Sequence, residues 1–173
     1  MRAPALALAL WAGLLLLCHL LWGWVPILDA ANLAFHEAGH PVFGLVCARL
    51  ALYGGTLMQL AIPAACALQM QRQRMRVGAA ACLIWFGESL LNVARYMADA
   101  RAQALPLVGG GDADDAHDWA QILGRWGLLS WDAALAAGVR IAALAVMAWA
   151  LWRAWRPAAE TTGGRRAPRH GVQ

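Results

Sequence analysis

Residues 35–40 of the chain read Phe-His-Glu-Ala-Gly-His, inside an apolar run that covers residues 27–50. His36 and His40 are four positions apart, so on a helix they project from one face, one turn from each other. This is the spacing at which two imidazoles bind one tetrahedral zinc ion. Glu37 would then lie beside the metal and take a proton from a zinc-bound water. The alternative interpretation is a structural histidine pair held by hydrogen bonds.

The composition indicates the class of protein. Of the 173 residues, 61% are hydrophobic and 14% are charged, which is more apolar and less charged than a soluble domain. Ten Trp against two Tyr suit a protein with aromatic anchors at a membrane interface. We therefore predict an all-α integral membrane protein, a helical bundle of four to five spans with one surface amphipathic helix. The net charge of +4 does not indicate nucleic acid, because the arginines lie mainly in short flanks and the tail.

The apolar stretches locate the spans. Besides residues 27–50, we predict helices across the bilayer at residues 5–24, 77–98 and 133–152, and a surface helix around residues 118–126. The stretch 54–70 is uncharged and starts with two glycines. It either crosses the bilayer or re-enters as a non-helical segment, which is tolerated only under a cover of protein or a water-filled cavity.

The charges predict the orientation. Arg72, Arg74 and Arg76 form a basic loop, whereas the loop after residue 106 is acidic. The positive-inside rule places the arginine loop and the C-terminal tail in the cytoplasm and the acidic loop outside. We expect a membrane domain over residues 1–156, a disordered basic tail over residues 157–173, and location in a bacterial plasma membrane. A site shared between the histidines and the acidic side weakly favours the re-entrant version of residues 54–70.

Two stripes of polar residues follow helical spacing and are predicted to face the bundle interior. The first stripe continues upstream from the histidines and consists of Asp29, Asn32, His36 and His40. The second consists of Glu88, Asn92, Tyr96 and Asp99. Asp29, Asn32, Glu88 and Asn92 are predicted to support the site by orienting a metal-binding imidazole. Asp29 is also explained as a helix cap, and Glu88 as a proton relay or a carboxylic acid kept neutral by burial.

A His-Glu-x-x-His motif in a bilayer helix, followed by Gly-Gly and a later polar span, resembles the site-2-protease family of intramembrane zinc metallopeptidases. The resemblance implies that His36 and His40 bind zinc and that Glu37 is the general base. In that family a later span adds an aspartate from an Asn-…-Asp-Gly motif. Asn92 and Asp99 are the nearest equivalents here, although Ala100 rather than glycine follows Asp99.

The third protein ligand is left open between two residues. A catalytic zinc keeps one position for water, so two histidines leave one ligand missing. Asp99 is slightly favoured by the resemblance. His117 has the more usual zinc chemistry and follows three glycines that give its loop freedom to fold in, with Asp118 beside it to hold the ring. Glu88 has a suitable depth, but we assign it to a supporting role.

These patterns predict a membrane-embedded zinc metallopeptidase that hydrolyses peptide bonds with zinc-activated water. Its partners would be the lipid bilayer and a peptide or membrane-protein substrate, without nucleic acid. A non-catalytic metal-binding or ion-transport component is the main alternative, because the same polar stripes would form an ion path. A structural subunit without metal is the third class.

Overall fold

The computed structural model describes residues 3–106 and 117–156, and that part of the chain is all helical, without strands. Its helices are α1 (Ala3–Trp22), α2 (Leu28–Val46), α3 (Ala51–Arg72), α4 (Arg76–Ala98), α6 (Asp118–Arg125) and α7 (Asp132–Trp155), with 3-10 turns at Ala48–Leu50 and Leu129–Trp131. The predicted all-α class is confirmed. The predicted basic tail and the three glycines before His117 lie outside the described residues.

Within the described part of the chain, four helical segments are long and apolar enough to cross a membrane, so the chain is a membrane protein. They are Ala3–Trp22, Ala48–Arg72, Arg76–Ala98 and Leu129–Trp155. The helix α2 was predicted as a further span but is not among the four. Its two histidines, Asp29 and Glu37 make it more polar than its neighbours, and a polar face in a bilayer needs cover from protein.

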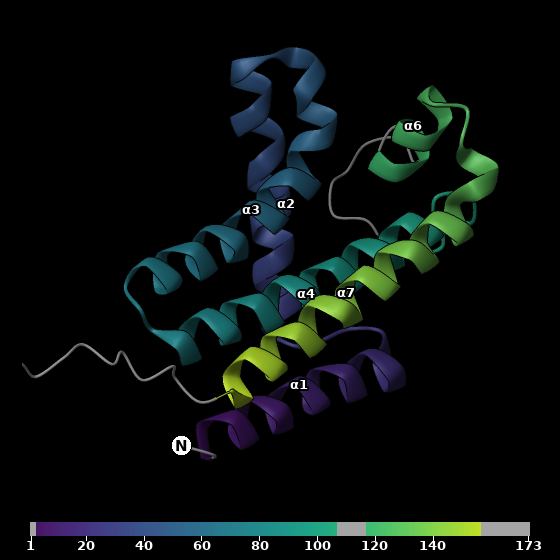
Figure 1. Cartoon of the computed structure of the whole chain (residues 1–173). Helices are drawn as coiled ribbons and strands as arrows, with labels where there is room; N and C mark the ends of the chain where they lie inside the picture. The colour runs from purple at the N-terminus through teal and green to yellow at the C-terminus, as the bar shows by residue number, and fades with distance from the viewer. Residues whose placement is uncertain (1–2, 107–116, 157–173) are drawn as a thin grey trace, which may run out of the picture.

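The preference for a re-entrant, non-helical stretch at residues 54–70 is wrong. These residues belong to the continuous helix α3, whose backbone hydrogen bonds lie mostly within the segment. The helix contains Pro63, which cannot donate a backbone hydrogen bond and whose ring opposes the carbonyl of Gln59. The ribbon of α3 bends part-way along its length (Figure 1), as expected from an internal proline.

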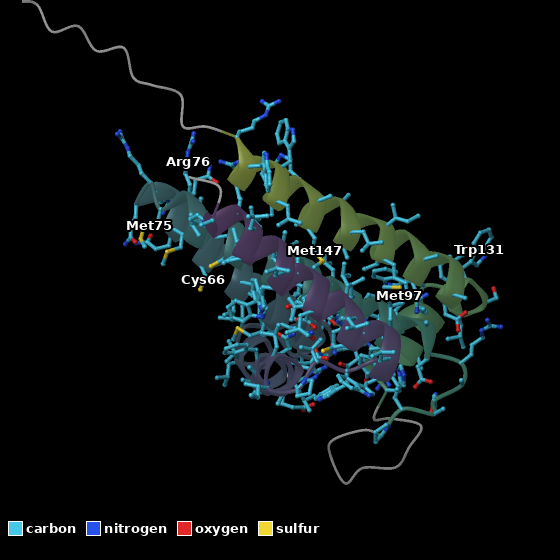
Figure 2. The ribbon with its side chains drawn as sticks, turned by 90° about the horizontal axis from the view of Figure 1, so that it is seen from below. Cys66, Met75, Arg76, Met97, Trp131 and Met147 are labelled. Atoms are coloured by element: carbon cyan, nitrogen blue, oxygen red, sulfur yellow. The ribbon has the colours of Figure 1, made fainter. Side chains whose placement is uncertain are left out.

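The helix α4 is the centre of the bundle. It packs against α7 most extensively and also contacts α3 and α1. In Figure 1 the helices α1, α4 and α7 run alongside one another, whereas α2 crosses this layer steeply and pairs with α3. Met147 and Met97, both buried, lie along the α4–α7 pair in Figure 2. Gly87 of α4 allows this close packing, because a side chain there would collide with Met147.

The two ends of the bundle differ in the residues that they carry. Met75 and Arg76 lie near the C-terminal end of α7, and Trp131 lies at the opposite end (Figure 2). At the first end Arg153 stacks over the Trp149 ring, 4.8 Å from its centroid. Basic groups from two parts of the chain therefore gather at one end, as the prediction of a shared cytoplasmic side requires.

Candidate metal centre

The site begins with the two histidines of α2. Their ring centroids are 5.0 Å apart, because residues four apart share a helix face. His36 is almost fully buried, whereas the side chain of His40 is partly open. The helix continues through Pro41, one residue after the pair, and ends at Val46. Both rings direct Nε2 toward the same point outside the helix.

Asp118 meets the two histidines at that point. Its Oδ2 lies 2.9 Å from Nε2 of His36 and 3.3 Å from Nε2 of His40. The side chain is largely buried and comes from the first turn of α6, far from α2 in the sequence. His36, His40 and Asp118 form one of two groups of metal-binding side chains in the described ranges, with ligand atoms all within 4.8 Å of one another.

A backbone contact fixes the tautomer of His40. Nδ1 of His40 lies 2.9 Å from the carbonyl oxygen of Ala51, and a carbonyl can only accept a hydrogen bond. Nδ1 therefore carries the proton, and in the neutral ring Nε2 presents a lone pair. That lone pair faces a carboxylate oxygen of Asp118, which is also an acceptor. Two facing acceptors need a proton or a cation between them.

Glu37 lies in the same cavity as the three converging side chains. The cavity has a volume of about 460 Å³ and is lined by Glu37, both histidines and Asp118, together with Trp24 and Leu105 among others. The Glu37 side chain is exposed, so its carboxylate is accessible to water in the cavity. A general base needs this combination of access and proximity.

Gly55 leaves room for a ligand atom or ion between α3 and the histidines. A Cβ added at Gly55 would lie 2.6 Å from Nε2 of His36 and 2.7 Å from Nε2 of His40. The residues just before His40 and Gly55 are Gly39 of α2 and Gly54 of α3, which face each other so closely that a Cβ on either would collide with the backbone carbonyl of the other. Gly54 and Gly55 therefore both face α2 and let the two helices approach closely.

Tyr96 joins α4 to the first turn of α6. The backbone N–H of Asp118 donates to the Tyr96 hydroxyl oxygen at 3.0 Å. The Tyr96 ring packs 4.3 Å from the His117 ring and 5.8 Å from the His36 ring, between centroids. Tyr96 therefore touches both sides of the site, a role that the sequence analysis did not assign to it.

Asp99 and His117, the two expected third ligands, lie near each other rather than at the histidine pair. Nε2 of His117 is 3.4 Å from Oδ2 of Asp99, and Nδ1 of His117 accepts the backbone N–H of Ala120 as the cap of α6. Burial lowers the pKa of His117, an effect that the nearby Asp99 opposes. Both Asp99 oxygens also accept backbone N–H groups, from Ala104 and Leu105. Asp118, expected to hold His117, reaches the histidines of α2 instead.

A second polar network lies deeper between α1, α2 and α4. The Asn32 amide donates to Glu88 at 2.7 Å, and Glu88 also contacts Nε2 of His19 at 3.1 Å. Asp29 accepts the backbone N–H of Val25 at 2.6 Å, and its side chain lines the cavity. Asn32 accepts from Trp85 and Ser89. Asp29, Asn32 and Glu88 therefore satisfy one another, and among the described residues none of the three contacts a ring nitrogen of the α2 histidines.

Two further residues that line the cavity form hydrogen bonds with other parts of the chain. Asn92 accepts a hydrogen bond from the Gln59 amide at 3.0 Å, across α3 and α4, and both line the cavity. The Arg95 guanidinium donates to the carbonyl oxygen of Gly23. Gly23 adopts φ +63, a left-handed conformation that the loop before α2 requires and that glycine tolerates.

No family model, no curated protein and no solved structure matches the chain. The resemblance to the site-2-protease family therefore rests on the motif of residues 36–40 and its setting.

Proposed function

We propose that the chain is a membrane-embedded zinc metallopeptidase, with His36, His40 and Asp118 as the zinc ligands and Glu37 as the general base. The observation that carries this proposal is the convergence of two imidazole Nε2 atoms and one carboxylate oxygen beside an accessible glutamate. Three protein ligands with one position left open are typical of a catalytic rather than a structural zinc site.

The distances support a zinc-sized centre. Ligand atoms about 2.0–2.1 Å from a tetrahedral zinc lie roughly 3.3 Å from one another. Oδ2 of Asp118 lies 2.9 and 3.3 Å from the two histidine nitrogens, so small adjustments would fit an ion among them. The hydrogen bond from His40 to the Ala51 carbonyl is the usual way to hold a zinc-binding imidazole in position.

Each group at the proposed site has its own role in peptide hydrolysis. When bound, zinc supplies an acidified water and a positive charge beside the peptide carbonyl. Glu37 takes the proton of that water and returns it to the amine that leaves. The cavity is large enough for a stretch of extended peptide. Gln59 and Asn92, which line it, offer amide groups that match the donors and acceptors of a peptide backbone.

The test compares zinc content and hydrolysis in purified full-length protein. We expect about one zinc per chain, and hydrolysis of fluorescent casein in detergent that a zinc chelator abolishes. Glu37→Gln should retain the zinc and lose the activity, because it removes the base but not a ligand. His36→Ala should lose both. Gly124→Ala is the control and should keep both zinc and activity, since a Cβ there meets nothing within 4 Å.

The outcomes separate the alternatives. If the wild type and Glu37→Gln both hold zinc and neither hydrolyses peptide bonds, the chain would be a metal-binding or transport component. A wild-type chain without zinc would contradict the metal centre altogether and leave a structural role.

A further inference from the structure

Arg140 lies near the middle of a membrane-spanning helix. Trp131 and Trp149 are 18 positions apart, which corresponds to roughly 27 Å along a helix. That length is close to the thickness of the bilayer core, about 30 Å, and tryptophan prefers its two boundaries. Figure 2 shows Trp131 at one end of α7, and Arg153 stacks on Trp149 toward the other. Arg140 is nine positions from each tryptophan.

The Arg140 side chain is exposed and lacks a partner within residues 3–106 and 117–156. Ala136, Ala143 and Met147 form the buried face of α7, and Arg140 lies beside that face rather than on it. Nothing among those residues forms a hydrogen bond or ion pair with its guanidinium. A charged side chain at this depth is costly and is normally paired with an opposite charge.

The surface around Arg140 permits another helix to approach. Exposed residues at helical spacing from Arg140 on the same flank are Ala133, Ala137, Leu144 and Ala148. Small side chains allow helix backbones to approach closely in a membrane. These alanines do not by themselves indicate a partner, but they leave the arginine accessible to one.

A second copy of the chain does not supply the missing charge from its described spans. The carboxylates of those spans, Glu88 and Asp132, are both buried, and Asp132 is already paired with Arg101 at 2.8 Å. Two copies that met through this flank would place Arg140 near Arg140, and like charges repel.

We propose that the Arg140 flank of α7 binds the transmembrane helix of a different protein, which carries an Asp or Glu near the middle of the bilayer. The carboxylate would pair with the guanidinium, and the exposed alanines would pack against the partner helix. The helix α7 packs mainly on α4, whereas the proposed zinc ligands lie on α2 and α6. The partner surface is therefore independent of the proposed peptidase activity.

The test uses the full-length protein in phosphatidylcholine vesicles with synthetic transmembrane peptides of about 24 residues, mainly Leu and Ala with Lys at both ends. Energy transfer between labelled protein and peptide reports association. A peptide with one central Asp should bind about tenfold more tightly than the same peptide with a central Leu, or with the Asp moved to its end. Arg140→Leu should remove this preference, and Arg140→Lys should retain part of it. Arg153→Leu, a change at the membrane boundary, should leave the preference intact.

Two results would overturn the proposal. Equal binding of the central-Asp and central-Leu peptides would mean that Arg140 is accommodated by lipid alone. A preference that survives in Arg140→Leu would mean that another part of the chain binds the peptide carboxylate. Helix content and oligomeric state of each variant are measured in the same vesicles, and a change of self-association in Arg140→Leu would assign the flank to a second copy instead.

Discussion

A methyl group added at Gly55 should weaken zinc binding and leave the fold intact, because the atoms nearest to it belong to the two histidine rings. In Gly55→Ala the new Cβ would lie 2.6–2.7 Å from both Nε2 atoms, and ordinary van der Waals contact begins near 3.4 Å. The distance from the methyl carbon to each Nε2 must therefore increase by roughly 0.8 Å, and we expect the imidazoles to move away from Asp118. Displacement of zinc-binding rings costs on the order of 10–100-fold in affinity, or about 1.4–2.7 kcal/mol.

The assay is a competition between the purified protein and a chelator of known zinc affinity, at fixed pH. Circular dichroism and thermal unfolding are recorded on the same samples. Gly124→Ala is the matched control, because a Cβ there meets nothing within 4 Å, and its zinc affinity should equal that of the wild type. Gly39→Ala should lower the unfolding temperature as well as the affinity, since its clash is with the backbone of α3. A Gly55→Ala variant with zinc affinity within twofold of wild type would refute the geometry of the site.

Three further predictions concern the ligand set and the membrane orientation. Asp118→Ala should weaken zinc binding by about 100-fold or more. Asp99→Ala should weaken it by about tenfold or less, because Asp99 binds backbone amides. Metal titration of both variants would show the reverse order if Asp99 were the ligand. Tyr96→Phe should keep the ring packing but lose the hydroxyl that holds the Asp118 backbone, with about tenfold weaker zinc binding in the same titration; unchanged binding would assign Tyr96 to packing alone. Cysteine introduced at Arg74 should react with an impermeant reagent from the cytoplasmic side and cysteine at Arg125 from the other side, and labelling of both from one side would contradict the predicted orientation.

The helices could be predicted from the sequence because each rests on local information. The long apolar run of residues 5–24 predicts a helix by length alone, and the structure has α1 at Ala3–Trp22. Residues 54–70 were misjudged because two glycines and a proline lower local helix propensity. The packing of α3 on α2 and α4 compensates for that cost, and such tertiary contacts are not visible in a single sequence.

The part of the candidate site that lies on α2 could be predicted for the same reason. The spacing of His36 and His40 is a property of one helix, so the sequence alone indicates that they share a face. The third side chain comes from α6, and its position depends on how the chain returns to α2. His117 and Asp118 are adjacent, so the start of a helix turns their side chains in different directions. The backbone turns His117 toward Asp99 and Asp118 toward the histidines, with the Tyr96 hydroxyl holding the Asp118 N–H.

The geometry also explains why an aspartate rather than a histidine suits this position. Asp118 is in the first turn of α6, where a short carboxylate interacts favourably with the helix dipole. His117 is committed to capping that helix through Nδ1, which leaves only Nε2 to face outward, toward Asp99. A carboxylate facing the lone pair of His40 is unfavourable without a proton or a cation between the two atoms. This local conflict is the kind that binding of a metal ion resolves, and it gives the adjacent pair His117 and Asp118 two separate roles.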